Sequence, residues 1–333
     1  MPGGLTLILI LSASDDRSVD LVAPKLTARG AEFLWWDSGE FPAESRFVSR
    51  LSDGGGWQHL LRTGGREYDT TAFTAVWNRR PSNPRAPAAV IDPSHRKYVE
   101  KLAGIFLYGW EDTLDSRWFP GRSWDLLRLQ NKLLNLAAAA KLGFITPETL
   151  ITNDAEELIP FWEKAGGRLI AKEVEFVGFQ VEGAEHVFYS TPVTRRHLTD
   201  RSRLDLSPAI LQPYVEKSIE LRVTVVGEQV FAAEIHSQGS RATKYDYRHY
   251  EQTFSKYGIH RLPADVEKRC LALTAALGLP YGCIDLILTP EGEYVYLEIN
   301  PSGQWGWIEA STGLPISDAI ADWLVAAEPV ESL

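Results

Sequence analysis

The sequence predicts a two-part fold, with an α/β domain first and a larger region of helices and antiparallel strands after it. The first third alternates apolar runs with amphipathic segments, which is typical of buried parallel strands and their connecting helices. The rest places alternating strands around tight turns, which is typical of antiparallel sheets. Between them, near "SRWFPGRSWD", Gly, Pro and Ser accumulate and indicate a boundary at about residue 120.

The first part is expected to contain strands and two helices. The strands are expected within residues 5–12, 31–37, a hairpin at 56–68, and 73–80. Helical spacing begins at residue 17 and is closed by Gly30. A second, long helix is expected from Asp92, an N-cap, and Pro93, at the first helical position. Together these elements predict an open sheet with helices.

The second part is expected to open on a long helix over residues 123–143, capped by Ser123 and ended by Gly143. Further helices are expected from Asn153 or Asp154 to about residue 167, and over 263–279. The expected strands are 149–152, a pair within 168–183 whose turn lies between Glu173 and Gly178, three strands within 209–237, and two within 281–300 around "TPEGE".

Composition excludes several classes of function. The net charge of -10 argues against nucleic acid as a partner, because binding to phosphates relies on an excess of Lys and Arg. The first apolar run, Leu5 to Leu11, lacks a basic flank and is far shorter than a membrane span, so we expect no membrane association. The only two cysteines, Cys270 and Cys283, suggest no oxidising compartment, and a cytoplasmic protein is expected.

Three polar residues in the last predicted hairpin suggest a metal site. Asp285 and Glu298 are expected to lie level across the ladder, and Asn300 is on the same face as Glu298. Oxygen ligands of this kind suit Mg²⁺, which takes one or two carboxylates together with phosphates and water. The alternative is a solvated hairpin face; a buried opposite face would instead make this one line a cleft, where paired carboxylates need a cation. Trp305 and Trp307, just beyond, are expected to wall that cleft.

A magnesium site that holds phosphates directs attention to lysines upstream. Lys132 lies early in the predicted long helix, and Lys172 ends the apolar strand "RLIA", where an ammonium group can reach into a cleft. The alternative is that both are ordinary surface lysines. Glu173 follows Lys172 and is grouped with it as a binding residue. Nucleophile elbows of the G-x-S-x-G type and H-E-x-x-H zinc motifs do not occur in the sequence.

The sequence contains, in this order, Lys132, Lys172, "LQPYVE", "IELRV", Asp285 and "YLEIN". This order and spacing, over residues 121–327, resembles that of the ATP-grasp ligases. The resemblance implies an ATP-grasp fold behind a pre-ATP-grasp α/β domain, divided as 1–120, 121–205 and 206–330. It also implies roles. The two lysines would contact the α and β phosphates, and Asp285, Glu298 and Asn300 would hold Mg²⁺. The adenine slot would be lined by Gln212, Tyr214 and Val215, and the ribose held by Glu220.

A narrower resemblance spans the whole chain. It rests on three segments, "VWNRRP", "KYDYRHY" and the tail from "NPSGQWGWIE". These segments are similar to those of the graspetide, or microviridin-type, peptide maturases. One position differs: this chain has Tyr247 where that family usually has Trp. The resemblance implies a ligase that joins Asp or Glu side chains of a ribosomal precursor peptide, made of leader and core, to its Ser, Thr or Lys. By analogy, a methyltransferase acts on the cyclised product and the ligase forms a homodimer.

Such chemistry needs positioning and charge neutralisation more than a nucleophile. Arg222 lies two residues beyond Glu220 on one strand face and is the first candidate to stabilise the transferred phosphate; Arg241 is the second. The alternative for either arginine is a structural ion pair with a neighbouring glutamate. Two alternatives stay open. One is a ligase that acts on a free amino acid or a protein terminus, of the glutamate-ligase or glutathione-synthetase type. The other is a nucleotide-binding regulatory module without turnover.

Overall fold

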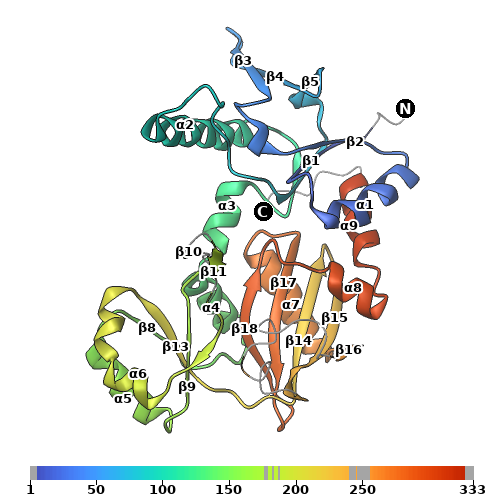
Figure 1. The fold of residues 1–333 in the computed structure, drawn as a ribbon. Helices are drawn as coiled ribbons and strands as arrows, with labels where there is room; N and C mark the ends of the chain where they lie inside the picture. Colours follow the sequence, from blue (N-terminus) through green and yellow to red (C-terminus); the bar gives the residue numbers. More distant parts are fainter. Residues whose placement is uncertain are drawn as a thin grey trace.

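The protein is described here by a computed structural model. It describes residues 6–175, 179–181, 184–186, 188–239, 245 and 256–326, with backbone only at 179–181 and 184–186. The chain builds an N-terminal α/β domain, a small central lobe and a C-terminal lobe around a long antiparallel sheet (Figure 1). The expected fold class, mixed α/β with an α+β second part, is confirmed. No helix in the described part of the chain is long and apolar enough to cross a membrane.

The N-terminal domain centres on a parallel sheet in the order β2-β1-β6-β7. Its strands are β1 (Leu7–Ser12), β2 (Glu32–Trp36), β6 (Ala75–Arg80) and β7 (Arg117–Phe119). A second sheet is formed by β3 (Arg46–Leu51), β4 (Trp57–Thr63) and β5 (Arg66–Asp69). Helix α1 (Arg17–Ala28) ends before Gly30, and α2 (Pro93–Asp112) starts at the Asp92 cap, as predicted.

The central lobe holds a sheet in the order β12-β9-β13-β8. These strands are β8 (Leu150–Thr152), β9 (Leu169–Lys172), β12 (Thr191–Pro192) and β13 (Ala209–Pro213). Helices α5 (Leu158–Lys164) and α6 (Arg195–Thr199) accompany the sheet, while β10 (Phe179–Val181) pairs with β11 (Ala184–His186) separately. The strands expected within 168–183 therefore exist, but β9 and β10 belong to different sheets.

The C-terminal lobe is a five-stranded antiparallel sheet in the order β16-β15-β14-β17-β18. Its strands are β14 (Ile219–Val226), β15 (Gln229–His236), β16 (Lys256–Ile259), β17 (Tyr281–Leu288) and β18 (Tyr294–Asn300). One face packs on helices α4 (Lys132–Lys141) and α7 (Ala264–Ala276), in a core that includes Val223, Ile284 and Tyr296. The chain ends in α8 (Gly306–Thr312) and α9 (Ile316–Val325).

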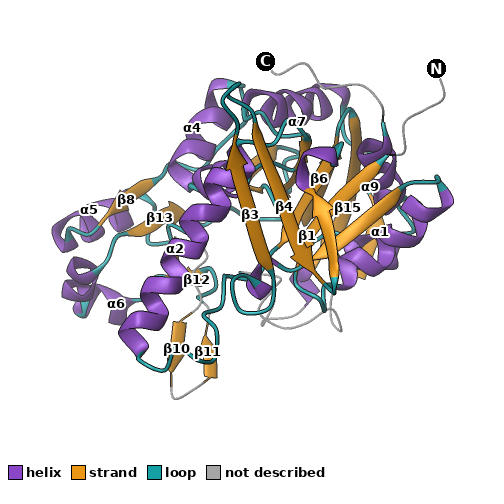
Figure 2. Cartoon of the chain, turned by 90° about the horizontal axis from the view of Figure 1, so that it is seen from above, coloured by secondary structure: helices purple, strands orange, loops and turns teal. Residues whose placement is uncertain are grey.

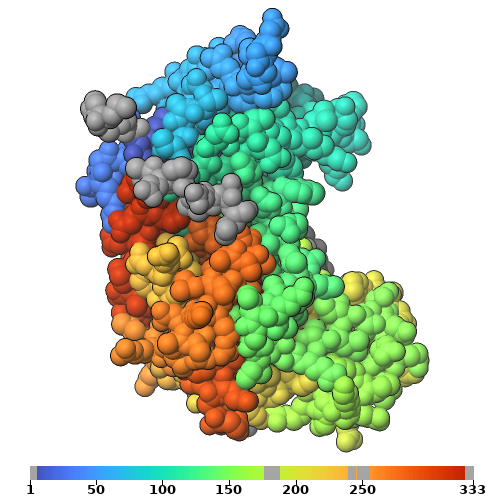
Figure 3. Space-filling model, turned by 180° about the vertical axis from the view of Figure 1, so that it is seen from behind, coloured from blue at the N-terminus to red at the C-terminus, as the bar shows by residue number. Residues whose placement is uncertain are grey.

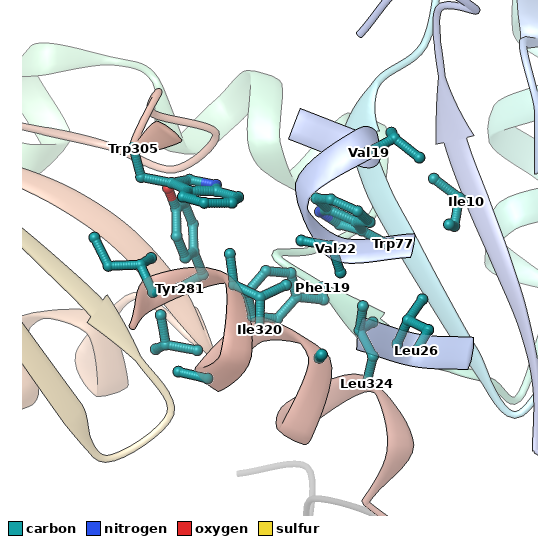
Figure 4. Close-up of a cluster of buried hydrophobic side chains, with 14 of the residues drawn as sticks. Ile10, Val19, Val22, Leu26, Trp77, Phe119, Tyr281, Trp305, Ile320 and Leu324 are labelled. Atoms are coloured by element: carbon teal, nitrogen blue, oxygen red, sulfur yellow. The ribbon is translucent and has the colours of Figure 1, made fainter. Parts of the chain in front are cut away.

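The opposite face of this sheet is shared with the N-terminal domain. Trp77 and Phe119 of the N-terminal domain meet Tyr281, Trp305 and Ile320 of the C-terminal lobe in one buried cluster (Figure 4). Polar contacts close its rim: Arg117 donates to the Trp323 and Leu324 carbonyls at the end of α9. The N-terminal domain and the C-terminal lobe therefore share a single hydrophobic core, whereas the central lobe has a separate one around Phe161 and Leu211.

Two expectations about local structure were wrong. The helix expected over 123–143 is two helices, α3 (Ser123–Leu129) and α4, because Asn131 turns out of the helix and its side chain caps α4 by accepting from the Leu133 amide. Ser123 is the first helical residue and not the cap, a place taken by Arg122. Strands β3, β7, β11, β12 and β16 and the two last helices were not predicted at all.

The junction between α2 and α3 contains a buried carboxyl group. Glu111 accepts hydrogen bonds from both the amide and the hydroxyl of Ser123, each at 2.7 Å, so the last turn of α2 holds the first turn of α3. The Asn78 amide also donates to the Ser123 hydroxyl at 3.1 Å. Burial raises the pKa of Glu111 from 4.5 to about 7. The folded protein therefore binds a proton at this carboxyl more tightly than the unfolded chain does.

A raised pKa in the folded state makes stability fall as the pH rises from the unfolded pKa to the folded one. We expect the free energy of unfolding to drop by on the order of 3 kcal/mol between pH 4.5 and 7 from this group alone, at about 1.4 kcal/mol per pKa unit. Glu111→Gln should remove that part of the pH dependence in urea unfolding. Asp115→Asn, an exposed carboxyl just beyond α2, is the control, and identical pH profiles for all three proteins would contradict the prediction.

Candidate functional site

One large cleft, of about 840 Å³, lies where the three parts of the protein meet. Its walls come from residues 78–84 of the N-terminal domain, from α2, α3 and β9, from the connection after β13, and from β14, β17 and β18. Figure 3 shows the central lobe, yellow-green, projecting beside the body that the other parts form. Most of the predicted site residues line this cleft.

The predicted metal ligands lie together at the end of the β17–β18 hairpin. Asp285 is directly opposite Glu298, and Asn300 is opposite Cys283, so the three side chains share one face, as predicted. The Asn300 amide lies 3.5 Å from Asp285 Oδ2. The reverse face is the buried core with Ile284 and Tyr296, so the polar face lines the cleft, the outcome that favours a metal over a solvated hairpin.

The carboxylates of Asp285 and Glu298 are each paired with a positively charged side chain. Arg222 faces Asp285 across β14 and β17, and its Nη1 donates to both carboxylate oxygens, at 2.8 and 3.0 Å. Lys132 Nζ lies 3.3 Å from Glu298 Oε2. Within the described residues, no cluster of three or more His, Cys, Asp or Glu side chains could hold a metal. Two carboxylates and one carboxamide nevertheless fit an Mg²⁺ that takes its other ligands from phosphates and water.

The two lysines approach the cleft from different elements. Lys132 is the first residue of α4, placed there by the break at Asn131, and its ammonium group also donates to the Glu173 carbonyl at 3.1 Å. Lys172 ends β9 and lines the cleft, as does Glu173. Glu173 Oε2 is buried and has no hydrogen-bond partner among the described residues. An unpartnered buried carboxylate oxygen is costly, so this group suits a ligand that donates to it.

The connection between β13 and β14 supplies the predicted nucleotide slot. Gln212 is buried and donates to Thr149 Oγ1 at 2.9 Å, and Tyr214 stacks edge-on to Tyr245, with ring centroids 5.5 Å apart. Val215 lines the same cleft. Glu220 is buried; one oxygen accepts from Lys217, and its Oε2 has no hydrogen-bond partner in the described structure. That free oxygen points to hydroxyl donors of a ligand.

Sequence reasoning missed two residues. Lys217 is buried beside Glu220, a position that only the three-residue spacing could have suggested. Arg79 entered the sequence analysis only as one residue of "VWNRRP". Its guanidinium is buried and donates to the Ser302 carbonyl, at 2.9 Å, and to Gln304 Oε1, at 2.6 Å. Arg79 thus joins the N-terminal domain to the loop after Asn300, a long-range contact with no local signal in the sequence.

The loop after Asn300 is also held by two residues of the C-terminal sheet. Tyr281 donates to the Gly303 carbonyl at 2.6 Å, and Arg222 Nη2 donates to the Gln304 carbonyl at 3.2 Å. A Cβ on Gly303 would lie 2.4 Å from Cys283 Cβ, so only glycine fits. Trp305 was expected to wall the cleft, which was wrong: it is 1% exposed and packs in the core shared by the two domains. Trp307 packs on Tyr257 beside the same core.

Arg241 lies outside the described residues, as does most of "KYDYRHY", so the structure does not place this second arginine. The other predicted residues, from Lys132 to Asn300, all line the one cleft. Their individual roles, and the domain limits at residues 120 and 205, stay predictions.

Comparison with protein families agrees with this geometry. Residues 7–119 match the model of the MvdD pre-ATP grasp domain, and residues 129–324 match the RimK-like ATP-grasp domain. The protein is therefore an ATP-dependent ligase of the ATP-grasp class. A comparison with curated proteins found no significant match.

Comparison with solved structures identifies a more specific family within the ATP-grasp class. A RiPP-associated ATP-grasp ligase of Chryseobacterium gregarium, in complex with ADP and a leader and core peptide, is 30% identical with a TM-score of 0.90, over 98% of both chains. The macrocyclases MdnC, bound to its precursor peptide MdnA, and MdnB, both of Microcystis aeruginosa MRC, are 28% and 30% identical. Their TM-scores are 0.85 and 0.80, over 96% and 97% of this chain and 99% of theirs. This chain belongs to the family of ATP-grasp ligases associated with ribosomal peptide products, and both resemblances predicted from its sequence are confirmed.

The ion pair between Lys132 and Glu298 leads to a prediction about metal binding. Because the ammonium group repels a cation at Glu298 but attracts phosphate, Lys132→Met should tighten Mn²⁺ binding to the nucleotide-free protein and weaken ATP binding, each by roughly tenfold. Mn²⁺ titration followed by electron paramagnetic resonance, and calorimetry with ATP, would measure the two effects. Lys141→Met, in the last turn of the same helix, is the control. Weaker Mn²⁺ binding in the Lys132 variant would refute this reading of the pair.

Proposed function

We propose that this ligase closes ester or amide rings within a ribosomally made precursor peptide. It would join Asp or Glu side chains of the core to Ser, Thr or Lys. The observation that carries the proposal is the composition of the cleft, where the nucleotide and metal residues face residues 78–84 of the N-terminal domain across one space. Arg80, exposed at that wall, supplies a positive charge that suits an acidic core peptide.

ATP and Mg²⁺ are the proposed cofactors. Lys132 and Lys172 would hold the phosphates, with Glu173 beside them, and Gln212, Tyr214 and Val215 would line the adenine slot. Glu220 would accept from the ribose hydroxyls through its unpartnered oxygen. Asp285, Glu298 and Asn300 would hold Mg²⁺, which when bound supplies positive charge beside the transferred phosphoryl group. Lys132 would then exchange its contact with Glu298 for a contact with phosphate.

The chemistry begins with a peptide carboxylate, which is a poor electrophile. Its oxygen attacks the γ phosphorus while the bond from that phosphorus to the ADP oxygen breaks, and an acyl phosphate results. A hydroxyl or amine of the same peptide then attacks the acyl carbon, loses its proton, and displaces inorganic phosphate. Arg222 faces the cleft beside Asp285 and would stabilise negative charge in both steps, with Arg241 as the second candidate. The protein contributes position and charge, and no covalent nucleophile.

The remaining expectations form part of the same proposal. The partner would be a precursor with leader and core, and a methyltransferase would act on the cyclised product. The ligase would work in the cytoplasm, where its two cysteines, both free and buried, would stay reduced. It would pair with a second copy as a homodimer. The lobes would divide near residues 120 and 205.

The decisive test is incubation with the precursor peptide, ATP and Mg²⁺. Ring closure should remove the mass of one water molecule for each bond formed, as measured by mass spectrometry. Glu298→Gln should keep the fold and abolish this loss, because a neutral amide binds Mg²⁺ poorly. Glu291→Gln, exposed in the turn of the same hairpin, is the control and should stay active.

Two outcomes would replace the proposal. An unchanged peptide, with ATP hydrolysed on addition of a free amino acid, would favour a carboxylate-amine ligase of the glutathione-synthetase type. Nucleotide binding without turnover on any carboxylate would favour a regulatory module.

Arg222 offers a second test within the reaction. Arg222→Lys keeps a charge beside Asp285 but loses the two-oxygen contact and the bond to the Gln304 carbonyl. The single-turnover rate of ring closure should fall by roughly 100-fold, the usual cost of one transition-state donor. The dissociation constant of ATP, measured by calorimetry, should change much less. Equal losses in rate and affinity would make Arg222 a binding residue only.

A further inference from the structure

The loop between β18 and α8 is held at three successive carbonyl groups. Each accepts a hydrogen bond from a side chain: Ser302 from Arg79 at 2.9 Å, Gly303 from Tyr281 at 2.6 Å, and Gln304 from Arg222 at 3.2 Å. Trp305, the next residue, is 1% exposed in the shared core (Figure 4). The backbone on both sides of Gln304 is therefore fixed, and so is the direction in which its side chain leaves the loop.

The Gln304 side chain is held at its tip as well. Arg79 Nη2 lies 2.6 Å from Gln304 Oε1. A guanidinium group can only donate, so the atom of the amide that it contacts is the oxygen, and the nitrogen, Nε2, is directed away from Arg79. Glutamine is among the side chains that lose most rotamer freedom when they are ordered. Here both the base and the tip are ordered, so the fold sets the position of the amide.

Arg79 gives this amide a rigid support. It is 4% exposed and lies near the end of β6, which pairs with β1 in the N-terminal sheet (Figure 2). Its Nη2 also donates to Ser18 Oγ at 3.1 Å, and its Nε forms an ion pair with Asp16 at 3.5 Å. Asp16 in turn caps α1 by accepting from the Ser18 amide. The N-terminal domain therefore determines which way the Gln304 amide faces.

The amide nitrogen of Gln304 is left for a ligand. Gln304 is partly exposed and lines the cleft. Its side-chain oxygen is engaged with Arg79 and its carbonyl with Arg222, whereas none of the described residues accepts a hydrogen bond from Nε2. An amide nitrogen carries two hydrogens that can be donated. The cleft thus contains an ordered donor that suits an oxygen atom of a bound molecule.

The neighbours of this amide indicate which oxygen it meets. Arg222, on the backbone side of Gln304, also holds Asp285 of the predicted metal site. Arg80, which follows Arg79 in β6, lies at the cleft wall proposed for the core peptide. The Gln304 side chain therefore reaches from the residues proposed for the phosphate toward the wall proposed for the peptide. Under the proposed function, the group that joins phosphate to peptide there is the carboxyl group being activated.

We propose that Gln304 is a catalytic residue whose Nε2 donates to the oxygen that stays on the acyl carbon, and that Arg79 is the positioning residue that aims this donor. The inference rests on the proposed function. In ring closure the peptide hydroxyl or amine bonds to the acyl carbon, and negative charge moves to this oxygen. The charge returns to the carbon as the bond to the phosphate oxygen breaks, and the proton of the nucleophile leaves with the phosphate. A donor ordered in advance stabilises that charge without reorganisation.

Substitutions at residue 304 separate this role from a structural one. Gln304→Glu keeps an oxygen for Arg79 but has no hydrogen to donate, whereas Gln304→Met has a similar length and neither group. Single-turnover ring closure, followed as the loss of water mass from the precursor, should slow by roughly 100-fold in both variants, the usual cost of one oxyanion donor. In Gln304→Glu the dissociation constant of ATP and the midpoint of thermal unfolding should stay close to those of the wild type.

Gln130→Glu is the control, because it makes the same change at an exposed position of the cleft wall, and it should stay active. A loss in the Met variant alone would make Gln304 a structural partner of Arg79. A loss in the Glu variant alone, or an equal loss in the control, would assign the effect to the added charge. Each of these results overturns the proposal. A wild type that leaves the precursor unchanged overturns the proposed function as well, whereas an active wild type with two active variants overturns this inference only.

A double-mutant cycle tests the positioning role of Arg79. Arg79→Lys keeps a positive charge beside Asp16 but lacks the fork that also holds the loop. Ring closure should slow by at least roughly tenfold, because a displaced donor is a weak one. Adding Gln304→Glu should then slow the Arg79→Lys protein much less than it slows the wild type. Losses that multiply would show that Arg79 does not act through Gln304, and would overturn that part of the proposal.

Discussion

The ion pair between Arg222 and Asp285 constrains the rest of the site. Both residues lie in the middle strands of the C-terminal sheet, opposite one another and almost fully buried. Breaking such a pair typically costs 3–5 kcal/mol, because it leaves one charge buried alone. The pair therefore ties the register of β14 to that of β17. Through β18 the same register sets Glu298 and Asn300, and through the Gln304 carbonyl it fixes the loop beyond them.

The shared core gives this arrangement a rigid frame. The N-terminal domain and the C-terminal lobe bury Trp77, Phe119, Tyr281 and Trp305 in one cluster, and Arg79 reaches from one domain into the loop that follows the predicted metal ligands of the other. The central lobe, in contrast, packs around its own core and brings Lys172 and Glu173 to the cleft. The N-terminal domain and the C-terminal lobe thus form one body on one side of the cleft, and the residues predicted to bind the nucleotide are divided between that body and the central lobe.

The local pattern of residues in the sequence was enough to predict much of the fold and of the candidate site. The alternation in the last hairpin placed Asp285 opposite Glu298, and the Asp92 cap placed the start of α2. What could not be predicted depends on partners far along the chain. Asn131 sits in a strong helical pattern, yet it caps a new helix and so directs Lys132 at Glu298. Trp305 follows the predicted metal ligands in sequence, but it packs against apolar side chains of the N-terminal domain in the shared core. Burial of that kind has no signature in a short window of residues.

The contact of Arg79 with Ser302 and Gln304 has a consequence for building hybrid enzymes. Exchange of the first 120 residues between two such ligases would cut through the shared core and separate Arg79 from the loop it supports, although sequence order makes that segment look modular. A graft of the central lobe would leave the shared core intact; among the described residues it would cut the connections to α4 and β14 and the contact of Lys132 with the Glu173 carbonyl. The practical unit of recombination in this chain is therefore the lobe in the middle, and the first and last thirds should be inherited together.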